Sequence, residues 1–433
     1  MSNQQKNQGN IIAIITMIFL FGMISFVTNL AAPMGVVLKE QFGVSNFEGM
    51  LGNAMNFIAY AIMGIPGGFL LQRIGYKKTA IVATIVGFVG VGIQFLAGNV
   101  SEGAAFSVYL LGALVAGFSM TLLNTVVNPM LNTLGGGGNK GNQLIQIGGS
   151  FNSLMATITP AFIGILIGSA VKAQISDVFP VLYIAMGIFA FATIALFILN
   201  IPEPSANKTT ESMGSLLSGA LKFRHFVLGA VAICAYIGVE VGVPATLNLW
   251  LSDTPSVGKV TAGFVAGTYW ALMLVGRLVG ASIGSKVSSK TMLTTASAVG
   301  LILVALAIFI PASDSNMIKL PVLMKDAAGS LSFGLAEVYI NAMFLVLVGL
   351  CTSIMWGGIF NLAVEGLGKY LTAASGIFMT MVCGGGLIPA FQGWVADVTG
   401  YQASYWVVFV CLGFLLYYAL IGCKNVNKDI AVD

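Results

Sequence analysis

The chain has 433 residues, of which 57% are hydrophobic and only 8% are charged, and its formal net charge is +4. Its mean hydropathy is +0.94. A soluble domain carries roughly 25% charged residues, so this composition excludes a soluble protein and indicates a chain surrounded by a lipid bilayer. The small positive charge gives no indication of nucleic-acid binding.

Long apolar runs fill most of the chain. A membrane-spanning helix needs about 20 apolar residues, and runs of this kind cover roughly 11–38, 47–71, 79–98, 104–134, 143–170, 178–200, 225–251, 260–284, 291–311, 338–363, 371–396 and 401–422. The first run is too long for a signal-peptide core and is interpreted as a retained helix. The sequence therefore predicts an all-α membrane protein with twelve transmembrane helices.

The basic residues are unevenly divided between the loops. If the N-terminus is cytoplasmic, most of the 19 Lys and Arg residues fall in cytoplasmic loops. The opposite loops hold Lys39, Lys172, Lys259, Lys319 and Lys325. Positive charge resists translocation, so we expect a multi-pass protein of a bacterial inner (plasma) membrane with both termini in the cytoplasm.

A polar break near the midpoint, 201–215, divides the runs into six and six. We expect an N-terminal six-helix bundle over 1–200, a cytoplasmic linker over 201–224 and a C-terminal six-helix bundle over 225–433. Two short similarities relate the halves: Gly68, Lys78 and Thr79 recur as Gly280, Lys290 and Thr291, and Pro160-Ala-Phe-Ile-Gly164 recurs as Pro389-Ala-Phe-Gln-Gly393. Such repeats are typical of transporters whose halves rock against each other.

Only two charged residues lie deep inside apolar runs, Glu240 and Arg277. A carboxylate in hydrocarbon costs several kcal/mol unless it is neutral, paired or faces a wet cavity. Glu240 is therefore a candidate for proton or cation coupling, or for accepting a sugar hydroxyl; the alternative is a neutral or paired carboxyl that only packs helices. Arg277 is interpreted as a structural anchor or gate, with direct substrate contact as the alternative.

Signatures of enzymes are weak. The only histidine, His225, is expected at a cytoplasmic helix entrance, and the glycine run 135–140 lacks the spacing and context of a phosphate-binding loop. The five cysteines lie in or beside apolar runs without metal-type spacing. We expect no enzymatic activity, no metal and no cofactor.

Several motifs carry a resemblance to known transporters. The segment 67–78 resembles the basic loop of the major facilitator superfamily, with Gln72 where that motif has Asp. The stretch 123–135, with its Asn-Pro at 128–129, and the following Phe-Asn-Ser at 151–153 resemble the fucose:proton symporter family of that superfamily. So do the stretches Tyr236-Ile-Gly-Val-Glu-Val-Gly242, Leu274-Val-Gly-Arg277 and Gly366-Leu-Gly-Lys-Tyr370. The resemblance covers most of the chain and implies the major facilitator fold, two six-helix bundles.

The departures from the family concern the proton carriers. The resemblance implies a titrating Asp in the first helix and a titrating Glu in the fourth, and these positions hold Ala32 and Asn124 here. Asn152 matches the family's sugar-binding Asn, but the accompanying Gln position holds Gly149, for which Gln146 can substitute. Glu240 is then the remaining buried group able to carry a proton.

Sugars are recognised by amides and carboxylates that bond hydroxyls and by aromatic rings that cover the C–H faces. The candidate sugar-binding residues are Asn124, Gln146, Asn152, Glu240, Asn248 and Asn361, with Trp270 and Trp356 as the aromatic residues. Any one of these amides can instead bridge helices, and any one of these tryptophans can be an interface residue.

The sequence thus predicts a transporter, acting as a monomer, that imports a neutral monosaccharide of hexose type. Residues 1–200 would rock against 225–433 around a site at the membrane midplane. Facilitated diffusion and proton coupling through Glu240 are both left open, with sodium as a third possibility. The rivals are an exporter of amphipathic compounds and a membrane sugar sensor that transports nothing.

Overall fold

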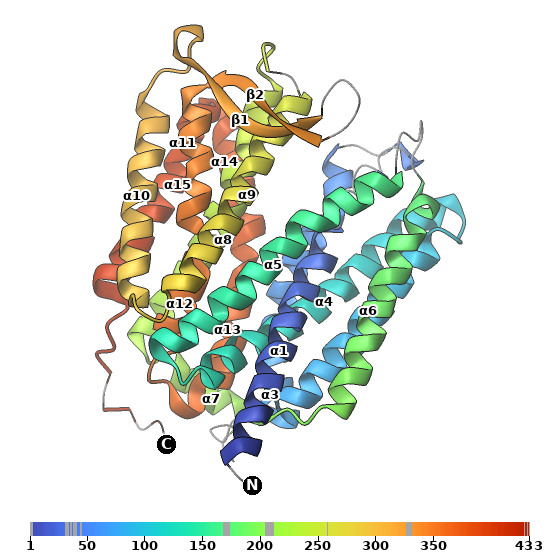
Figure 1. Ribbon diagram of the computed structural model, residues 1–433, viewed down its shortest axis with the longest axis vertical. Helices are drawn as coiled ribbons and strands as arrows, with labels where there is room; N and C mark the ends of the chain where they lie inside the picture. The colour runs from blue at the N-terminus through green and yellow to red at the C-terminus, as the bar shows by residue number, and fades with distance from the viewer. Residues whose placement is uncertain are drawn as a thin grey trace. The chain divides into compact units, whose positions relative to one another are not determined.

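The computed structural model describes residues 3–30, 34, 37, 41–43, 46–167, 174–203, 212–257, 259–325, 331–427, 429–430 and 432. These residues form long helices and one two-stranded hairpin (Figure 1). The contacts divide the chain into two compact units. Unit 1 comprises Met1–Phe223, Val364–Cys383 and Asn425–Asp433, and unit 2 comprises Arg224–Ala363 and Gly384–Lys424.

Unit 1 consists of helices that pack through small residues. Its elements are α1 (Asn3–Thr28), α3 (Asn46–Ala97), α4 (Glu102–Leu134), α5 (Gly138–Ile167), η1 (Ile175–Val178), α6 (Phe179–Ile198), α7 (Met213–Ala220), η4 (Gly368–Tyr370), α13 (Leu371–Thr380) and η5 (Met381–Cys383). α3 packs on α4 and α6, and α1 packs on α5 and α4. Where α3 crosses α4, a Cβ placed on Gly112 would lie 2.7 Å from the backbone nitrogen of Gln94, so glycine permits the close approach.

α3 contains two of the expected helices, 47–71 and 79–98. The change of direction occurs at Gly75, which has φ 82° and ψ 175°, a conformation that residues with a Cβ rarely adopt. The basic loop expected between the two helices is thus only a few residues long.

Glu203, from the segment after α6, caps the second half of α3. Its carboxylate accepts hydrogen bonds from the backbone nitrogens of Tyr76 (2.8 Å) and Lys77 (2.9 Å). These N–H groups begin a helix and have no partner within it, and a negative charge is stabilised at that end. Lys77 Nζ also donates to the carbonyl of Phe197 at the end of α6, so the turn is held from two sides.

Glu203→Ala is expected to lower the free energy of unfolding by about 1 kcal/mol, the usual cost of losing a helix cap. Thermal unfolding in detergent measures it. Glu203→Gln is the matched control and should lose less, because an amide oxygen can still accept one of the two bonds. An unfolding temperature of Glu203→Ala equal to that of the wild type would show that the cap contributes nothing.

Unit 2 is built from the second half of the chain. Its elements are α8 (Arg224–Ser252), α9 (Lys259–Ile283), α10 (Ser289–Phe309), η3 (Asp314–Asn316), β1 (Met317–Lys325), β2 (Leu331–Tyr339), α11 (Ile340–Thr352), α12 (Met355–Val364), α14 (Gly384–Thr399), α15 (Tyr401–Tyr417) and the π-helical turn η6 (Tyr418–Gly422). α8 packs on α9, α11, α14 and α15. α10 begins where the Ser288 hydroxyl accepts a bond from the Thr291 nitrogen, a common N-cap.

A β-hairpin joins α10 to α11, where the sequence indicated only a loop. β1 and β2 pair antiparallel, with Lys319 opposite Glu337 and Pro321 opposite Leu335. One face of the hairpin packs on α9 and α11 and buries side chains such as Val322 and Val338, while Phe333 on the other face is 85% exposed. Figure 1 shows the hairpin at one end of the helices of unit 2.

Each of the twelve expected runs falls mainly on described helices, and the ends of the runs 11–38 and 143–170 lie partly outside the described residues. The run 143–170 corresponds to α5, the run 338–363 is divided between α11 and α12, and the run 371–396 is divided between α13 and α14. Ten stretches of the described residues are long and apolar enough to cross a membrane. One of them, Ala54–Ala97, holds the two helices that meet at Gly75.

The contacts divide the chain differently from the expected boundaries. Residues 364–383 group with the N-terminal helices rather than with the rest of 225–433. The physical reason is the close packing of α13 on α3, where a Cβ placed on Gly68 would lie 3.1 Å from the Cα of Gly376. The linker is also partly helical, because it contains α7. This short helix packs on α13. The bundles 1–200 and 225–433 therefore remain a proposal about which helices move together.

Candidate functional site

A carboxylate and a guanidinium meet inside unit 2. Glu240 lies in the middle of α8 and Arg277 lies on the neighbouring helix α9. Arg277 Nη2 donates to Glu240 Oε1 over 3.2 Å, and the side chains of Arg277 and Glu240 are only 11% and 12% exposed, respectively. The pair places two opposite charges in a mainly apolar setting, where each compensates the desolvation of the other.

Aromatic residues surround the pair. Tyr236, one turn before Glu240 on α8, is fully buried, and its hydroxyl is within electrostatic range of both charges without a hydrogen bond of good geometry. Trp356 of α12 lies beside Tyr236, with ring centroids 6.3 Å apart. On α9, the Tyr269 hydroxyl is bonded to Thr352 of α11 over 2.8 Å. A carboxylate beside aromatic rings has the chemical character of a sugar site.

The other candidates of unit 2 have different surroundings. The Asn361 amide donates to Ser289 Oγ over 2.9 Å, which ties the end of α12 to the start of α10. Trp270 is 39% exposed and contacts Tyr269 edge to face. Asn248, near the end of α8, has a buried Oδ1 that bonds no described residue. Of the predicted residues in unit 2, the structure therefore groups Glu240 and Trp356 around Tyr236 and gives Asn361 a bond between helix ends.

In unit 1, Asn124 belongs to a chain of polar groups. Its Nδ2 donates to the hydroxyl of Tyr60 on α3, and its Oδ1 accepts from Asn128 Nδ2 over 3.1 Å. Asn128 also donates to the main-chain carbonyl of Asn124. Pro129 follows directly within α4. Asn124 therefore uses both its donor and its acceptor side inside the unit.

Asn152 and Gln146 lie two turns apart on α5. Asn152 Nδ2 donates to the carbonyl of Phe21 on α1 over 2.8 Å, so this amide links two helices. Gln146 is 2% exposed, and its main-chain carbonyl accepts from Ser150 Oγ. Ala32, the other position of interest in the first half, lies outside the described residues.

Sequence reasoning missed two features of unit 2. Gln392 on α14 is fully buried, and neither of its amide atoms bonds a described residue. Tyr236 was quoted only as part of a motif, although it lies between Glu240 and Trp356. His225 lies at the start of α8, at the helix entrance expected from the sequence, and its side chain is fully buried there. Helix rotation, which decides burial here, cannot be determined from runs that are apolar on all sides.

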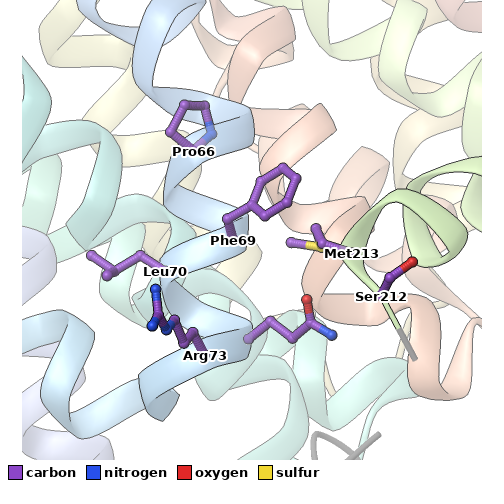
Figure 2. Close-up of a pocket in the computed structure, with 7 residues that line it drawn as sticks. Pro66, Phe69, Leu70, Arg73, Ser212 and Met213 are labelled. Atoms are coloured by element: carbon purple, nitrogen blue, oxygen red, sulfur yellow. The ribbon is translucent and has the colours of Figure 1, made fainter. Parts of the chain in front are cut away.

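A hollow in unit 1 lies at a different place. It has a volume of about 550 Å³ and is lined by Pro66, Phe69, Leu70, Gln72, Arg73, Ser212 and Met213. Figure 2 shows side chains from α3 and from the start of α7 facing this hollow. None of the predicted sugar-binding residues lies in it.

The family profile of the Major Facilitator Superfamily matches residues 14–388. The chain belongs to the Major Facilitator Superfamily. It is 30% identical over 436 residues to the glucose/galactose transporter of Brucella abortus biovar 1 (strain 9-941), an alignment that covers 98% of this chain and 97% of that protein. It is 21% identical over 412 residues to the L-fucose-proton symporter of Escherichia coli (strain K12), covering 89% and 86% of the two chains.

A solved structure confirms the fold. The crystal structure of the E. coli fucose:proton symporter superposes with a TM-score of 0.77 at 19% sequence identity, covering 94% of this chain and 98% of that one. The major facilitator fold of twelve transmembrane helices predicted from the sequence is thereby confirmed. As a major facilitator, the chain is a multi-pass membrane protein of a transporter family.

Proposed function

We propose that this major facilitator transports a hexose-type monosaccharide into the cell. The observation that carries the proposal is the Glu240–Arg277 pair with Tyr236 and Trp356 beside it. A carboxylate and a guanidinium bond sugar hydroxyls, and the rings cover the apolar face of the sugar. Two relatives whose names specify glucose, galactose or fucose support the same substrate class.

The orientation of the chain in the membrane is inferred from its charge distribution. We infer a bacterial inner membrane with both termini in the cytoplasm, because the loops on that side hold most of the Lys and Arg residues. The bacterial origin of the relatives supports this location. The transporter acts as a monomer, by alternating access.

The candidate sugar-binding residues differ in chemistry from one unit to the other. In unit 2 they are the charged pair, the aromatic rings and Asn248, whose buried oxygen bonds no described residue. In unit 1 they are the amides Asn124, Gln146 and Asn152. Asn124 takes the place of a carboxylate that the family resemblance implies; an amide bonds hydroxyls but cannot titrate. Asn361 and Trp270 are the weakest candidates for sugar binding. Asn361 bonds Ser289 between two helix ends, and Trp270 is partly exposed.

Two coupled mechanisms and one uncoupled mechanism are consistent with this proposal. Because Asn124 and Ala32 cannot take up a proton, transport is either facilitated diffusion, or is driven by protons through Glu240, or by sodium held on amide and backbone oxygens. The ion pair with Arg277 makes Glu240 a better coupling group than the amides. When the Glu240 carboxyl is protonated, it loses its charge and the pair can open, so that proton uptake is linked to a change in contacts.

Counterflow in proteoliposomes tests the proposal. Purified protein is reconstituted, loaded with unlabelled hexose and given labelled glucose, galactose or fucose outside. We expect rapid exchange of at least one sugar, and accumulation when a pH or sodium gradient is added if transport is coupled. Sugar binding without exchange would indicate a sensor, and efflux of amphipathic dyes without hexose exchange would indicate an exporter.

Asn152→Ala is expected to weaken sugar binding by about 1–3 kcal/mol, the cost of removing one partner of a buried hydrogen bond. Calorimetric titration of monodisperse protein measures the affinity. Asn99→Ala is the control, because Asn99 Nδ2 also donates to a main-chain carbonyl, that of Phe95 one turn earlier, but at an exposed position. An affinity of Asn152→Ala equal to that of the wild type would remove Asn152 from the site.

A further inference from the structure

The hollow of unit 1 has a polar side and an apolar side. It lies between α3 and the start of α7, and the lining side chains of both helices are drawn in Figure 2. Polar groups come from Gln72, Arg73 and Ser212, and the remaining lining residues are Pro66, Phe69, Leu70 and Met213. The volume of about 550 Å³ is within the range of about 300–1,000 Å³ that is usual for ligand pockets. The hollow therefore suits a ligand with a polar and an apolar part.

Arg73 carries the only charge among the described residues that line the hollow. Its guanidinium makes no hydrogen bond or ion pair with a described residue, and its side chain is exposed. Ser212 Oγ accepts a bond from the Ser215 nitrogen, which leaves the hydroxyl hydrogen available to donate. Gln72 stands where the superfamily motif has Asp, so it adds no negative charge. A free guanidinium and a hydroxyl donor in one hollow are the groups that bind a phosphate.

An exposed apolar stripe on α3 leads into the hollow. Its members follow each other at three or four residues, the spacing of one helix face, and are 36–53% exposed: Ile58, Ile62, Ile65 and Phe69. Arg73 comes four residues after the last of them. Other sides of α3 are covered, because Gly67 packs against Leu122 of α4 and Gly68 packs against Gly376 of α13. The stripe therefore faces the lipid, with Arg73 at its end.

The charge of the neighbouring turn indicates the kind of ligand. Lys77 and Lys78 follow Arg73 across the turn at Gly75, so three cations lie at the end of the stripe. Clusters of Lys and Arg at a membrane surface attract anionic lipids. An apolar stripe that ends in hydrogen-bond donors and positive charge matches acyl chains that end in a phosphate. A soluble phosphate would leave the apolar side of the hollow without a contact.

We propose that this hollow is a binding site for an anionic phospholipid, with its phosphate on Arg73 and its acyl chains along the stripe. Ser212 donates to a second phosphate oxygen, and Phe69 covers the glycerol carbons. The site lies within unit 1 and does not involve the Glu240–Arg277 pair, so it does not depend on the proposed sugar transport. Because the lipid contacts both α3 and α7 in the folded chain, its binding raises the unfolding temperature.

Arg73→Gln tests the proposal, and Lys78→Gln is the matched control, since it removes a charge of the same turn that does not line the hollow. The full-length protein in detergent is titrated with phosphatidylglycerol. Native mass spectrometry measures the bound lipid, and the unfolding temperature is recorded in the same detergent. We expect the wild type and Lys78→Gln to bind one phosphatidylglycerol with similar affinity and to unfold at a higher temperature with it. Arg73→Gln should bind at least tenfold more weakly and show no such rise.

Gln72→Asp is the second variant, because it places the carboxylate of the superfamily motif in the hollow and leaves Arg73 unchanged. It should also lower the affinity for phosphatidylglycerol at least tenfold. Phosphatidylcholine with the same acyl chains should bind the wild type more weakly, because its choline carries a positive charge. Glycerol 3-phosphate and inorganic phosphate at the same concentration should not raise the unfolding temperature, since they have no acyl chains.

Other outcomes would overturn the proposal. Equal losses in Arg73→Gln and Lys78→Gln would mean that the turn attracts lipid by its overall charge and that the hollow holds none. Wild-type affinity in Gln72→Asp would mean that the phosphate does not lie in the hollow, and this result decides the question even if Arg73→Gln cannot be purified. A rise in the unfolding temperature with inorganic phosphate equal to that with phosphatidylglycerol would identify a soluble phosphate as the ligand.

Discussion

Arg277→Gln is expected to destabilise the protein by about 3–5 kcal/mol, because it leaves Glu240 buried without a partner. The side chains of the pair are only 11% and 12% exposed, so little water reaches the remaining carboxylate. Thermal unfolding in detergent, with sugar absent, measures the loss. We expect sugar exchange by this variant to be weak as well, since an unpaired carboxylate pulls water or a proton into the site.

The double variant Glu240→Gln/Arg277→Gln distinguishes the stability contributed by the ion pair from the cost of leaving one charge buried alone. Two neutral amides can bond each other, so the double variant should recover most of the stability that either single variant loses. Arg224→Gln is the control for a lost arginine of the same unit; its guanidinium donates to Tyr417 at an exposed position. A double variant no more stable than Arg277→Gln would show that the pair does not stabilise unit 2.

Glu240→Gln is expected to abolish accumulation driven by a pH gradient while leaving counterflow measurable. The amide keeps the shape and the hydrogen-bonding oxygen of the carboxyl but cannot release or take up a proton. Proteoliposomes with an imposed pH gradient measure accumulation, and the same vesicles without a gradient measure exchange. Uptake by the wild type should increase when the outside is acidified, because protons then flow inward with the sugar. Uptake by the variant should not change with the outside pH.

Glu337→Gln is the matched control, because this carboxyl belongs to the same unit but lies on the exposed face of the hairpin. It should leave accumulation unchanged. Proton-driven uptake that survives Glu240→Gln would exclude this residue as the coupling group. If the wild type does not accumulate sugar under any gradient, facilitated diffusion is the remaining mechanism.

The number and order of helices could be predicted from the sequence because a spanning helix requires only a local run of apolar residues. A run of about 20 apolar residues is readable without knowing its neighbours, and the twelve runs correspond to described helices. The hairpin between α10 and α11 could not be predicted. Its buried residues, such as Val322 and Val338, are covered by α9 and α11 rather than by each other. The grouping of α13 with α3 depends likewise on contacts far apart in the chain.

The sequence pointed to a candidate site residue most directly where a single residue carried the signal alone. Glu240 was identified because a carboxylate in hydrocarbon is expensive wherever it points. Its partner Arg277 was interpreted as an anchor, since no pattern relates positions on two different helices. Asn361 was grouped with the sugar-binding amides by residue type, yet it bonds Ser289 between two helix ends. Gln392 gave no signal, because a glutamine near the end of an apolar run is ordinary.

The hairpin has a consequence for measuring motion. A two-stranded ribbon is at best marginally stable by itself, so β1 and β2 keep their register through the cover that α9 and α11 provide on one face. Its amide hydrogens are protected from exchange with solvent only while that cover is in place. Deuterium uptake in the ribbon therefore follows the separation of α9 and α11, one of which carries Arg277, without any attached label.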